Sequence, residues 1–137
     1  MEYSRDFVKA HGMFLERPDM FTFDDYGPND LLLSLKDYNF FFQQDHITAF
    51  KPIEYGVSEV HTYTRDTVNP RHALEMLEND VKALSLMFHT LVTYVPDNFR
   101  GTINFLEKRL GFVNYGECAI RYYSGKPVKV NLLKRIL

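Results

Sequence analysis

The chain has 137 residues, of which 45% are hydrophobic and 15% are aromatic, and its formal net charge at pH 7 is −2. This length is typical of a single domain with its own hydrophobic core. The near-neutral charge, without any basic block, argues against a nucleic-acid partner. The single cysteine, Cys118, excludes an internal disulfide and favours a reducing compartment; its place within a predicted strand indicates a buried core thiol.

The start of the chain has no apolar signal core, and no apolar run approaches the ~18 residues needed to cross a membrane. We therefore expect a cytoplasmic protein with no membrane partner. The five histidines show no metal-ligand spacing, so we expect no metal site.

Helical patterns come first in the chain. Residues 4–15 predict a helix that Ser4 caps and Pro18 ends. Residues 29–35 contain four leucines after Asn29, a good cap, and fit either a short helix or a buried strand. Phenylalanine-rich residues 39–43 and residues 47–53, separated by a polar turn, then predict a β-hairpin.

The central stretch has the clearest pattern. Residues 57–64 are rich in β-branched and aromatic types and predict a strand. A polar loop follows, in which Asn69 is a good helix cap and Pro70 fits the first helical position. The next helix is amphipathic because apolar residues recur on one stripe, which consists of Ala73, Leu77, Val81, Leu84 and Phe88.

A second strand and helix complete this stretch. Residues 90–95 predict a buried strand that Pro96 ends. Asp97 or Asn98 can cap a helix, and Gly111 stands where a left-handed C-terminal cap belongs. After Phe112, two segments predict antiparallel strands around a turn at residues 124–127. The fold expected is an α/β single domain with a mixed, mostly antiparallel sheet, a central parallel strand pair, and helices on both faces.

Two polar features of this stretch call for an explanation. The loop lies at the positive end of a helix dipole, between Arg65 and Arg71, and can bind a phosphate or pyrophosphate, although most such turns bind nothing. Glu59, His61 and Tyr63 alternate onto one face of a central strand, where burial of a charge is costly. The pair of Glu59 and His61 is either a general base aimed into a cleft or an internally hydrogen-bonded, partly solvated pair.

Residues 57–112 resemble the acetyl-CoA-binding half of the GNAT acyltransferases, in which a central strand leads to a pyrophosphate loop and a helix. In that family a second helix ends in Lys-Leu-Gly-Phe, and residues 108–112 here read Lys-Arg-Leu-Gly-Phe. The stretch is also similar to small GNAT-like proteins encoded by phages. The resemblance implies one GNAT-like domain over residues 1–137, with an acceptor side (1–55), an acetyl-CoA-binding core (56–112) and C-terminal strands (113–137).

The resemblance also implies a mechanism. Acetyl-CoA would lie in a split between the parallel strands, and a primary amine would attack its thioester directly. Glu59 or His61 would accept the ammonium proton. The cofactor-binding residues so implied are Thr62, Tyr63, Thr64, Arg65, Asn69, Arg71, His72, Ala73 and Asn98. The acceptor side would be built from residues 20–42 and the loop around Ser124.

The active-site pattern departs from the family in two places. The family's phosphate loop is rich in glycine, but no glycine occurs here between Gly56 and Gly101. The tyrosine that often protonates the leaving thiolate is replaced by Glu107, which is a poor acid at neutral pH unless its pKa is raised.

Three hypotheses follow. The first is an N-acetyltransferase that uses acetyl-CoA on an amine of a small molecule or a protein. The second is a catalytically degenerate GNAT-fold phage protein that acts as a virion-assembly or interaction module, in a host cytoplasm or a virion, with a homo-oligomer as one form. The third is a small-ligand binder of unrelated fold.

Overall fold

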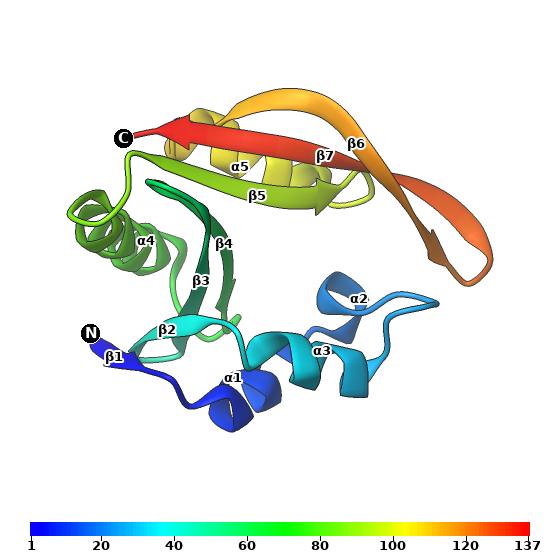
Figure 1. Cartoon of the computed structure of the whole chain (residues 1–137), viewed down its shortest axis with the longest axis horizontal. Coiled ribbons are helices and arrows are strands. Elements are labelled where there is room, and N and C mark those ends of the chain that lie inside the picture. The colour runs from blue at the N-terminus through cyan, green and yellow to red at the C-terminus, as the bar shows by residue number, and fades with distance from the viewer.

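Figure 1 shows the computed structural model, which describes residues 1–137 as one α/β domain. Its centre is a seven-stranded sheet with the strand order β1-β2-β3-β4-β5-β7-β6. Only β4 and β5 are parallel, and every other neighbouring pair is antiparallel. The strands are β1 (Glu2–Ser4), β2 (Asn39–Gln43), β3 (His46–Glu54), β4 (Val57–Thr64), β5 (Thr90–Pro96), β6 (Val113–Tyr123) and β7 (Lys126–Ile136).

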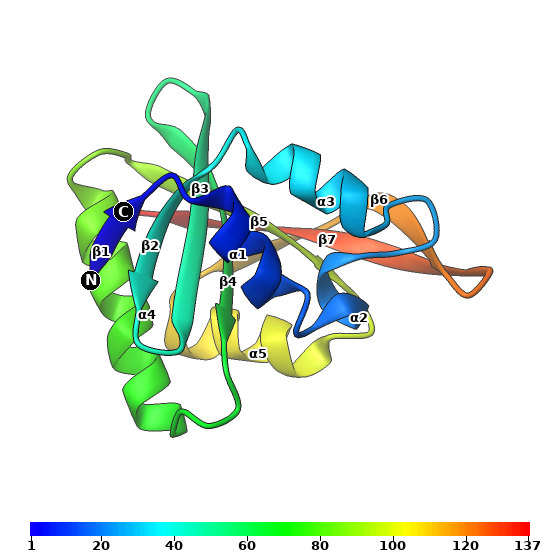
Figure 2. The same cartoon turned by 90° about the horizontal axis from the view of Figure 1, so that it is seen from below.

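Five helices cover the two faces of this sheet. Figure 2 shows α1, α2 and α3 in front of the strands, with α4 and α5 behind them. Each layer has its own hydrophobic core, and the predicted fold class is confirmed. The helices are α1 (Phe7–Phe14), α2 (Pro18–Phe21), α3 (Pro28–Leu35), α4 (Pro70–Ser85) and α5 (Arg100–Arg109). No helix is long and apolar enough to cross a membrane.

The two central strands separate soon after they begin. β4 pairs with β5 only from Val57↔Thr90 to Glu59↔Val92. Beyond this point β4 stays with β3 as far as Thr64, whereas β5 stays with β7 as far as Pro96. Figure 1 shows the two halves of the sheet diverging from this junction.

Helix α4 forms as its sequence predicts. The Asn69 side chain accepts a hydrogen bond from the His72 N–H at 3.0 Å, and Pro70 occupies the first turn. The apolar stripe packs on the sheet, with Leu77 and Leu84 buried. Because the helix also buries Asp80, which is not on that stripe, its contact face is wider than the sequence pattern indicates.

The buried Asp80 carboxylate joins α4 to the neighbouring strands. It accepts hydrogen bonds from His46 Nε2 at 2.6 Å, Thr48 Oγ1 at 2.5 Å and Gln43 Nε2 at 2.9 Å. The other ring nitrogen of His46, Nδ1, lies 2.7 Å from Thr64 Oγ1. We call these five residues the sealed network.

Helix α5 ends as predicted but begins differently. Gly111 has a φ of +69°, and the Phe112 N–H donates to the Leu106 carbonyl at 3.0 Å, which closes the helix C-terminus. The prediction that Asp97 or Asn98 caps its start is wrong, because the residue at the cap position is Phe99, which makes no side-chain cap bond. The Asp97 carboxylate instead accepts a hydrogen bond from the Asn131 amide at 2.5 Å.

The two N-terminal cap predictions also need correction. Ser4 belongs to β1, and α1 is capped by Asp6, whose carboxylate accepts the Lys9 N–H at 3.0 Å. Residues 29–35 do form a helix rather than a strand, but α3 begins at Pro28 and its cap position is Gly27. Since several cap-competent residues occur close together here, local sequence did not decide which one is used.

The C-terminal hairpin extends past the rest of the sheet and is tied to the α2–α3 loop. The Asp24 carboxylate accepts hydrogen bonds from the Ser124 N–H at 2.8 Å and the Gly125 N–H at 2.7 Å. The Asp24 N–H donates to the Tyr122 carbonyl at 2.9 Å. The prediction that Cys118 is a core thiol is wrong, because it lies on the edge strand β6 and is exposed.

Candidate active site

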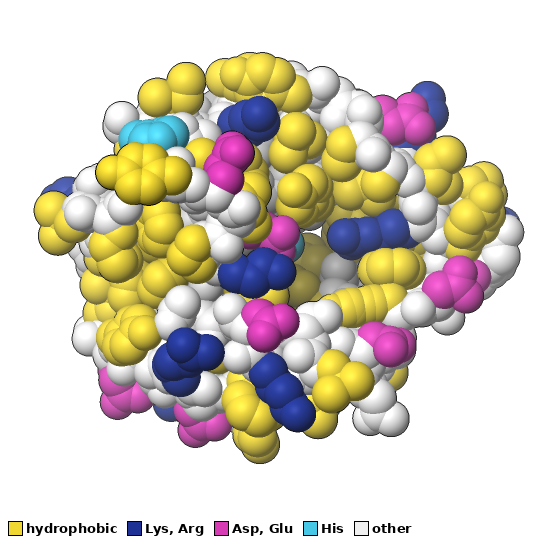
Figure 3. Space-filling view, viewed as in Figure 1, with side chains coloured by type: hydrophobic (Ala, Val, Ile, Leu, Met, Phe, Trp, Pro, Cys, Tyr) yellow, Lys and Arg dark blue, Asp and Glu magenta, His cyan; other side chains and the backbone are white.

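A cavity of about 850 Å³ opens where β4 and β5 separate. Its walls come from both faces of the sheet, for example Phe14 and Tyr26 on one side and Leu77 and Leu106 on the other. Of its 36 lining residues, 24 are hydrophobic, so the few polar side chains on its wall stand out. Figure 3 shows this hollow, with acidic and basic side chains around a mostly apolar interior.

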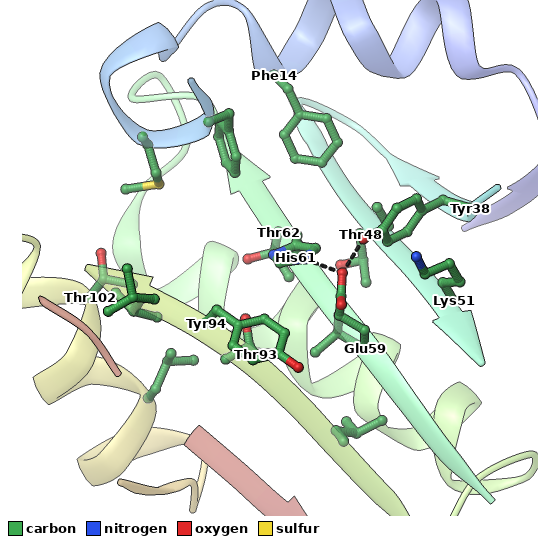
Figure 4. A pocket seen from close by; sticks show the side chains of 18 of the residues that line it. Phe14, Tyr38, Thr48, Lys51, Glu59, His61, Thr62, Thr93, Tyr94 and Thr102 are labelled. Atoms are coloured by element: carbon green, nitrogen blue, oxygen red, sulfur yellow. Dashed lines mark hydrogen bonds and ion pairs between the residues drawn. The ribbon is translucent and has the colours of Figure 1, made fainter. Parts of the chain in front are cut away.

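Glu59 and His61 lie together on the cavity wall. Glu59 Oε2 accepts a hydrogen bond from His61 Nε2 at 2.7 Å and another from the Tyr38 hydroxyl. Figure 4 shows the three side chains converging, with the Lys51 side chain beside them. The two residues bond to each other, as one sequence interpretation expected, and they also line a cavity; the general-base role stays a prediction.

The electrostatics separate the roles of these two residues. Burial raises the pKa of the Glu59 carboxyl, but the hydrogen bonds from His61 and Tyr38 and the Lys51 charge outweigh it and lower that pKa from 4.5 to about 2. Glu59 is therefore a carboxylate at neutral pH and a weak base. Because the Glu59 carboxylate accepts a hydrogen bond from His61 Nε2–H, the neutral imidazole carries its basic lone pair on Nδ1, which bonds to no other residue.

Tyr94 faces the same part of the cavity from β5. Figure 4 shows its ring across the split from Glu59 and His61. Burial raises the pKa of the Tyr94 hydroxyl, with a further contribution from the Glu59 charge, so the hydroxyl stays protonated at neutral pH. It makes no hydrogen bond within the protein and is free to donate one to a ligand.

The far half of β4 has an open edge. Thr62, Tyr63 and Thr64 pair with β3 on one side, but no strand pairs with them on the other, since the ladder to β5 stops at Glu59. Backbone groups along such an edge can bond to an extended ligand, as an added strand would.

The loop between β4 and α4 also leaves donors free. The backbone N–H groups of Asp66, Thr67, Asn69 and Arg71 donate no hydrogen bond within the protein, and the Arg71 side chain is exposed and forms no ion pair. The loop therefore offers donors at a helix N-terminus without any glycine. Ala73 lies in the first turn, and His72 Nδ1 lies 3.6 Å from the Glu75 carboxylate.

Arg65 is held within the protein. Its guanidinium donates to both carboxylate oxygens of Glu16, at 2.9 Å each, and to the Asp45 carboxylate at 2.8 Å. These hydrogen bonds raise the pKa of Arg65 further above its ordinary value. The Tyr63 hydroxyl donates to the same Glu16 at 3.0 Å. Arg65 thus fastens the start of the loop to the α1–α2 connection and to the β2–β3 turn.

Of the predicted site residues, only Glu59, His61 and Thr62 line the cavity. The predicted residues from Tyr63 to Ala73 lie along the far half of β4, the loop after it and the first turn of α4. Glu107 and Asn98 are exposed and lie apart from both. Sequence reasoning also missed Tyr38, Tyr94 and Lys51, which do line it. The signal for Tyr94 was available, because it alternates with Val92 on a strand predicted to lie beside Glu59.

No protein-family model and no curated protein sequence matches this chain, but solved structures do. One is the ribosomal-protein-alanine N-acetyltransferase from Brucella melitensis, at a TM-score of 0.69 and 10% identity over 100% of both chains. A GNAT-family acetyltransferase from Streptococcus pneumoniae matches at a TM-score of 0.66 and 15% identity over 99% of both chains. The Vibrio cholerae spermidine N-acetyltransferase in complex with CoA and spermine matches at a TM-score of 0.70 and 15% identity, over 96% of this chain and 89% of the other. The chain therefore has the GNAT acetyltransferase fold.

Proposed function

We propose that this protein is an N-acetyltransferase that transfers the acetyl group of acetyl-CoA to a primary amine. The observation that carries the proposal is the His61–Glu59 pair, which presents a free imidazole nitrogen to a cavity at the point where the parallel strands part. An oriented imidazole is the side chain used most often as a general base. Neighbours of the same fold include enzymes named for acetylation of protein alanine and of spermidine, both of which supply an amine.

The cofactor would occupy the open edge of β4 and the start of α4. The pantetheine arm would pair with the backbone of Thr62 to Thr64. The pyrophosphate would meet the free N–H groups of Asp66, Thr67, Asn69 and Arg71, and the exposed Arg71 guanidinium would supply the cation. Arg65 contributes indirectly, because its two carboxylate partners hold the loop in place.

The reaction follows from these positions. The amine nitrogen attacks the thioester carbonyl carbon, so that a C–N bond forms and the C–S bond breaks. The ammonium proton passes to His61 Nδ1, directly or through a water molecule, and the Glu59 carboxylate stabilises the resulting imidazolium. The Tyr94 hydroxyl donates a hydrogen bond to the departing thiolate, which then takes a proton from solvent.

Calorimetric titration with acetyl-CoA tests the cofactor site. We expect micromolar binding, about −8 kcal/mol, and at least tenfold weaker binding by Arg71→Glu. Lys82→Glu is the matched control, since it makes the same charge change on an exposed residue in the last turn of the same helix. The proposal fails if the wild-type protein binds no acetyl-CoA at millimolar ligand, or if Arg71→Glu binds as tightly as the control.

A second candidate function is a non-catalytic interaction module, and one feature favours it. The edge strand β6 carries exposed apolar side chains, among them Val113 at 56%, Tyr115 at 59% and Ile120 at 52% exposure. Exposed apolar side chains on an unpaired edge strand are typical of an interface. This function predicts no acetyl-CoA binding in the same titration and a stable oligomer or complex by light scattering, whereas a monomer that turns over acetyl-CoA would refute it.

A further inference from the structure

The side chain of His61 faces the layer that α1, α2 and α3 form. Its ring centroid lies 6.0 Å from that of Tyr38, which is part of the hydrophobic core of this layer. Tyr63, two residues further along β4 and therefore on the same face, packs against the same core. Val60, on the opposite face, belongs to the core under α4 and α5. The part of the cavity next to His61 is thus the part on the side of the three N-terminal helices.

This part of the cavity has an aromatic wall, to which Phe14, Phe21 and Phe23 contribute. The Phe14 and Phe21 rings meet edge to face with 4.5 Å between their centroids, and the Phe21 ring meets the Tyr63 ring in the same way at 6.3 Å. Successive residues on one face of a strand lie about 7 Å apart, so Tyr63 is the neighbour of His61 along this face. The aromatic wall therefore adjoins the imidazole.

Next to this wall, one carboxylate oxygen is free to bind a positive charge. Glu59 accepts the hydrogen bonds from His61 and Tyr38 at Oε2, whereas its Oε1 makes no hydrogen bond within the protein and is not sealed from solvent. A protonated amine can bind to Oε1 with its nitrogen close to His61. Because this contact uses only the second oxygen, the bonds that orient the pair remain in place when the amine binds.

No comparable acidic group is available for a second positive charge. Both carboxylate oxygens of Asp80 are bonded within the sealed network, and Asp37 is exposed, where an ion pair is weak. The remaining charged residues of the cavity, Lys51 and Arg121, are cations. Arg121 lies 4.7 Å from the ring centroid of Phe23, beside the aromatic wall. A ligand with several ammonium groups would therefore place one of them against apolar rings or another cation, both of which are unfavourable.

We infer that the acceptor is a monoamine with an aromatic ring on a short linker, whose ammonium group binds Glu59 Oε1 beside His61 and whose ring packs against Phe14 and Phe21. This inference rests on the proposed function, because it takes the His61 side of the cavity as the acceptor side. Aromatic rings favour edge-to-face contacts with one another, and a ligand ring extends the series that these side chains begin. Phe21 acts as a specificity-determining residue that selects the ring.

A comparison of phenethylamine with ethylamine and 1,4-diaminobutane tests this inference, since both of the latter lack the ring and the diamine adds a second charge. Binding to isotopically labelled protein is followed by NMR titration, both without and with CoA, so that it does not depend on turnover. We expect phenethylamine to bind at least about tenfold more tightly than either. Phe21→Ala should reduce this preference by about threefold or more, and Phe21→Leu should retain most of it. Phe7→Ala, at a half-buried phenylalanine of the same layer that does not line the cavity, is the matched control and should leave the preference unchanged.

Three results would overturn the inference: no binding of phenethylamine by the wild-type protein at millimolar ligand, binding of ethylamine or the diamine as tight as that of phenethylamine, or a full preference that persists in Phe21→Ala. The cofactor titration is separate. If the ring preference holds while acetyl-CoA does not bind, the transferase proposal fails and the amine site stands. If acetyl-CoA binds and phenethylamine does not, the transferase proposal stands and the aromatic acceptor is wrong.

Discussion

The molecule contains two histidine–carboxylate pairs that have nearly the same N–O distance but differ in their exposure to solvent. His46 and Asp80 lie 2.6 Å apart with side chains 0% and 2% exposed, whereas His61 and Glu59 lie 2.7 Å apart with side chains 26% and 15% exposed. Around the first pair, every ring nitrogen and carboxylate oxygen has a protein partner. In the second, one ring nitrogen faces a cavity without a partner.

This difference shows how the same chemical pair can serve stability or chemistry. A sealed pair, once satisfied, offers no lone pair to a ligand, and its loss leaves buried groups without partners. A half-open pair is still oriented by one hydrogen bond, but its free nitrogen can exchange a proton with a substrate. We therefore expect variants of the sealed pair to affect folding and variants of the open pair to affect turnover.

The largest expected effect is on stability, at the sealed pair. Asp80→Ala removes the acceptor shared by His46, Thr48 and Gln43 and should lower the free energy of unfolding by about 3–5 kcal/mol. Urea denaturation measures this change. Glu78→Ala, at an exposed carboxylate on the same helix, is the control and should change stability by less than about 0.5 kcal/mol. A loss below about 1 kcal/mol in Asp80→Ala would contradict the structural role.

The next effect is on rate, at the open pair. His61→Ala should lower kcat for amine acetylation by about 10²–10⁴-fold, because it removes the proposed general base. It should cost less stability than His46→Ala, because Tyr38 still donates a hydrogen bond to Glu59. His46→Ala is the matched variant and should show the reverse, with several kcal/mol of lost stability. Acetylation assays and urea denaturation of both variants distinguish a catalytic from a structural role. Full turnover in His61→Ala would exclude His61 as the base.

A third effect appears at acid pH. The pKa of Glu59 is lowered from 4.5 to about 2 in the folded protein, so the folded state binds this proton less readily than the unfolded state. Glu59 therefore contributes stability above pH 4.5, at most about 3 kcal/mol, and loses it as the pH falls towards 2. Urea denaturation along this pH range should show a smaller acid loss in Glu59→Gln. Identical pH profiles would mean that the folded-state pKa is not lowered.

The smallest effect tests the rule that sealed polar groups need partners. The Tyr123 hydroxyl is buried and has no hydrogen-bond partner. Removing it in Tyr123→Phe should leave stability unchanged or raise it by up to about 1 kcal/mol, since no bond is lost. Tyr122→Phe, at an exposed neighbour, serves as the reference. A clear loss of stability in Tyr123→Phe alone would contradict this account.

Local sequence patterns were sufficient for the central fold and for part of the site. The β4–α4–β5 order, the Asn69 cap and the Gly111 terminus follow from spacing and turn chemistry. The alternation in β4 placed Glu59 and His61 on one face. These features depend on neighbours within a few residues, which a single sequence displays.

Partners that are distant in sequence were not predictable in this way. Tyr38 bonds to Glu59 across 21 positions, and Arg65 bonds to Glu16 across 49. Asp80 has the pattern of an ordinary helix charge until β2 and β3 supply its partners. A residue's exposure and its remaining hydrogen-bonding capacity depend on such contacts, so its role becomes apparent only in the assembled domain.

The Asp24 link to the C-terminal hairpin has a consequence for the order of folding. It joins residues that are 100 and 101 positions apart in the chain, so its turn, at residues 124 and 125, is synthesised long after the α2–α3 loop. The Asp24 contact in the α2–α3 loop can therefore form only after the β6–β7 hairpin has been synthesised. During synthesis on a ribosome, β4 and α4 can form well before this link does. We expect hydrogen-exchange pulse labelling during refolding to show the Ser124 and Gly125 amides protected later than those of α4.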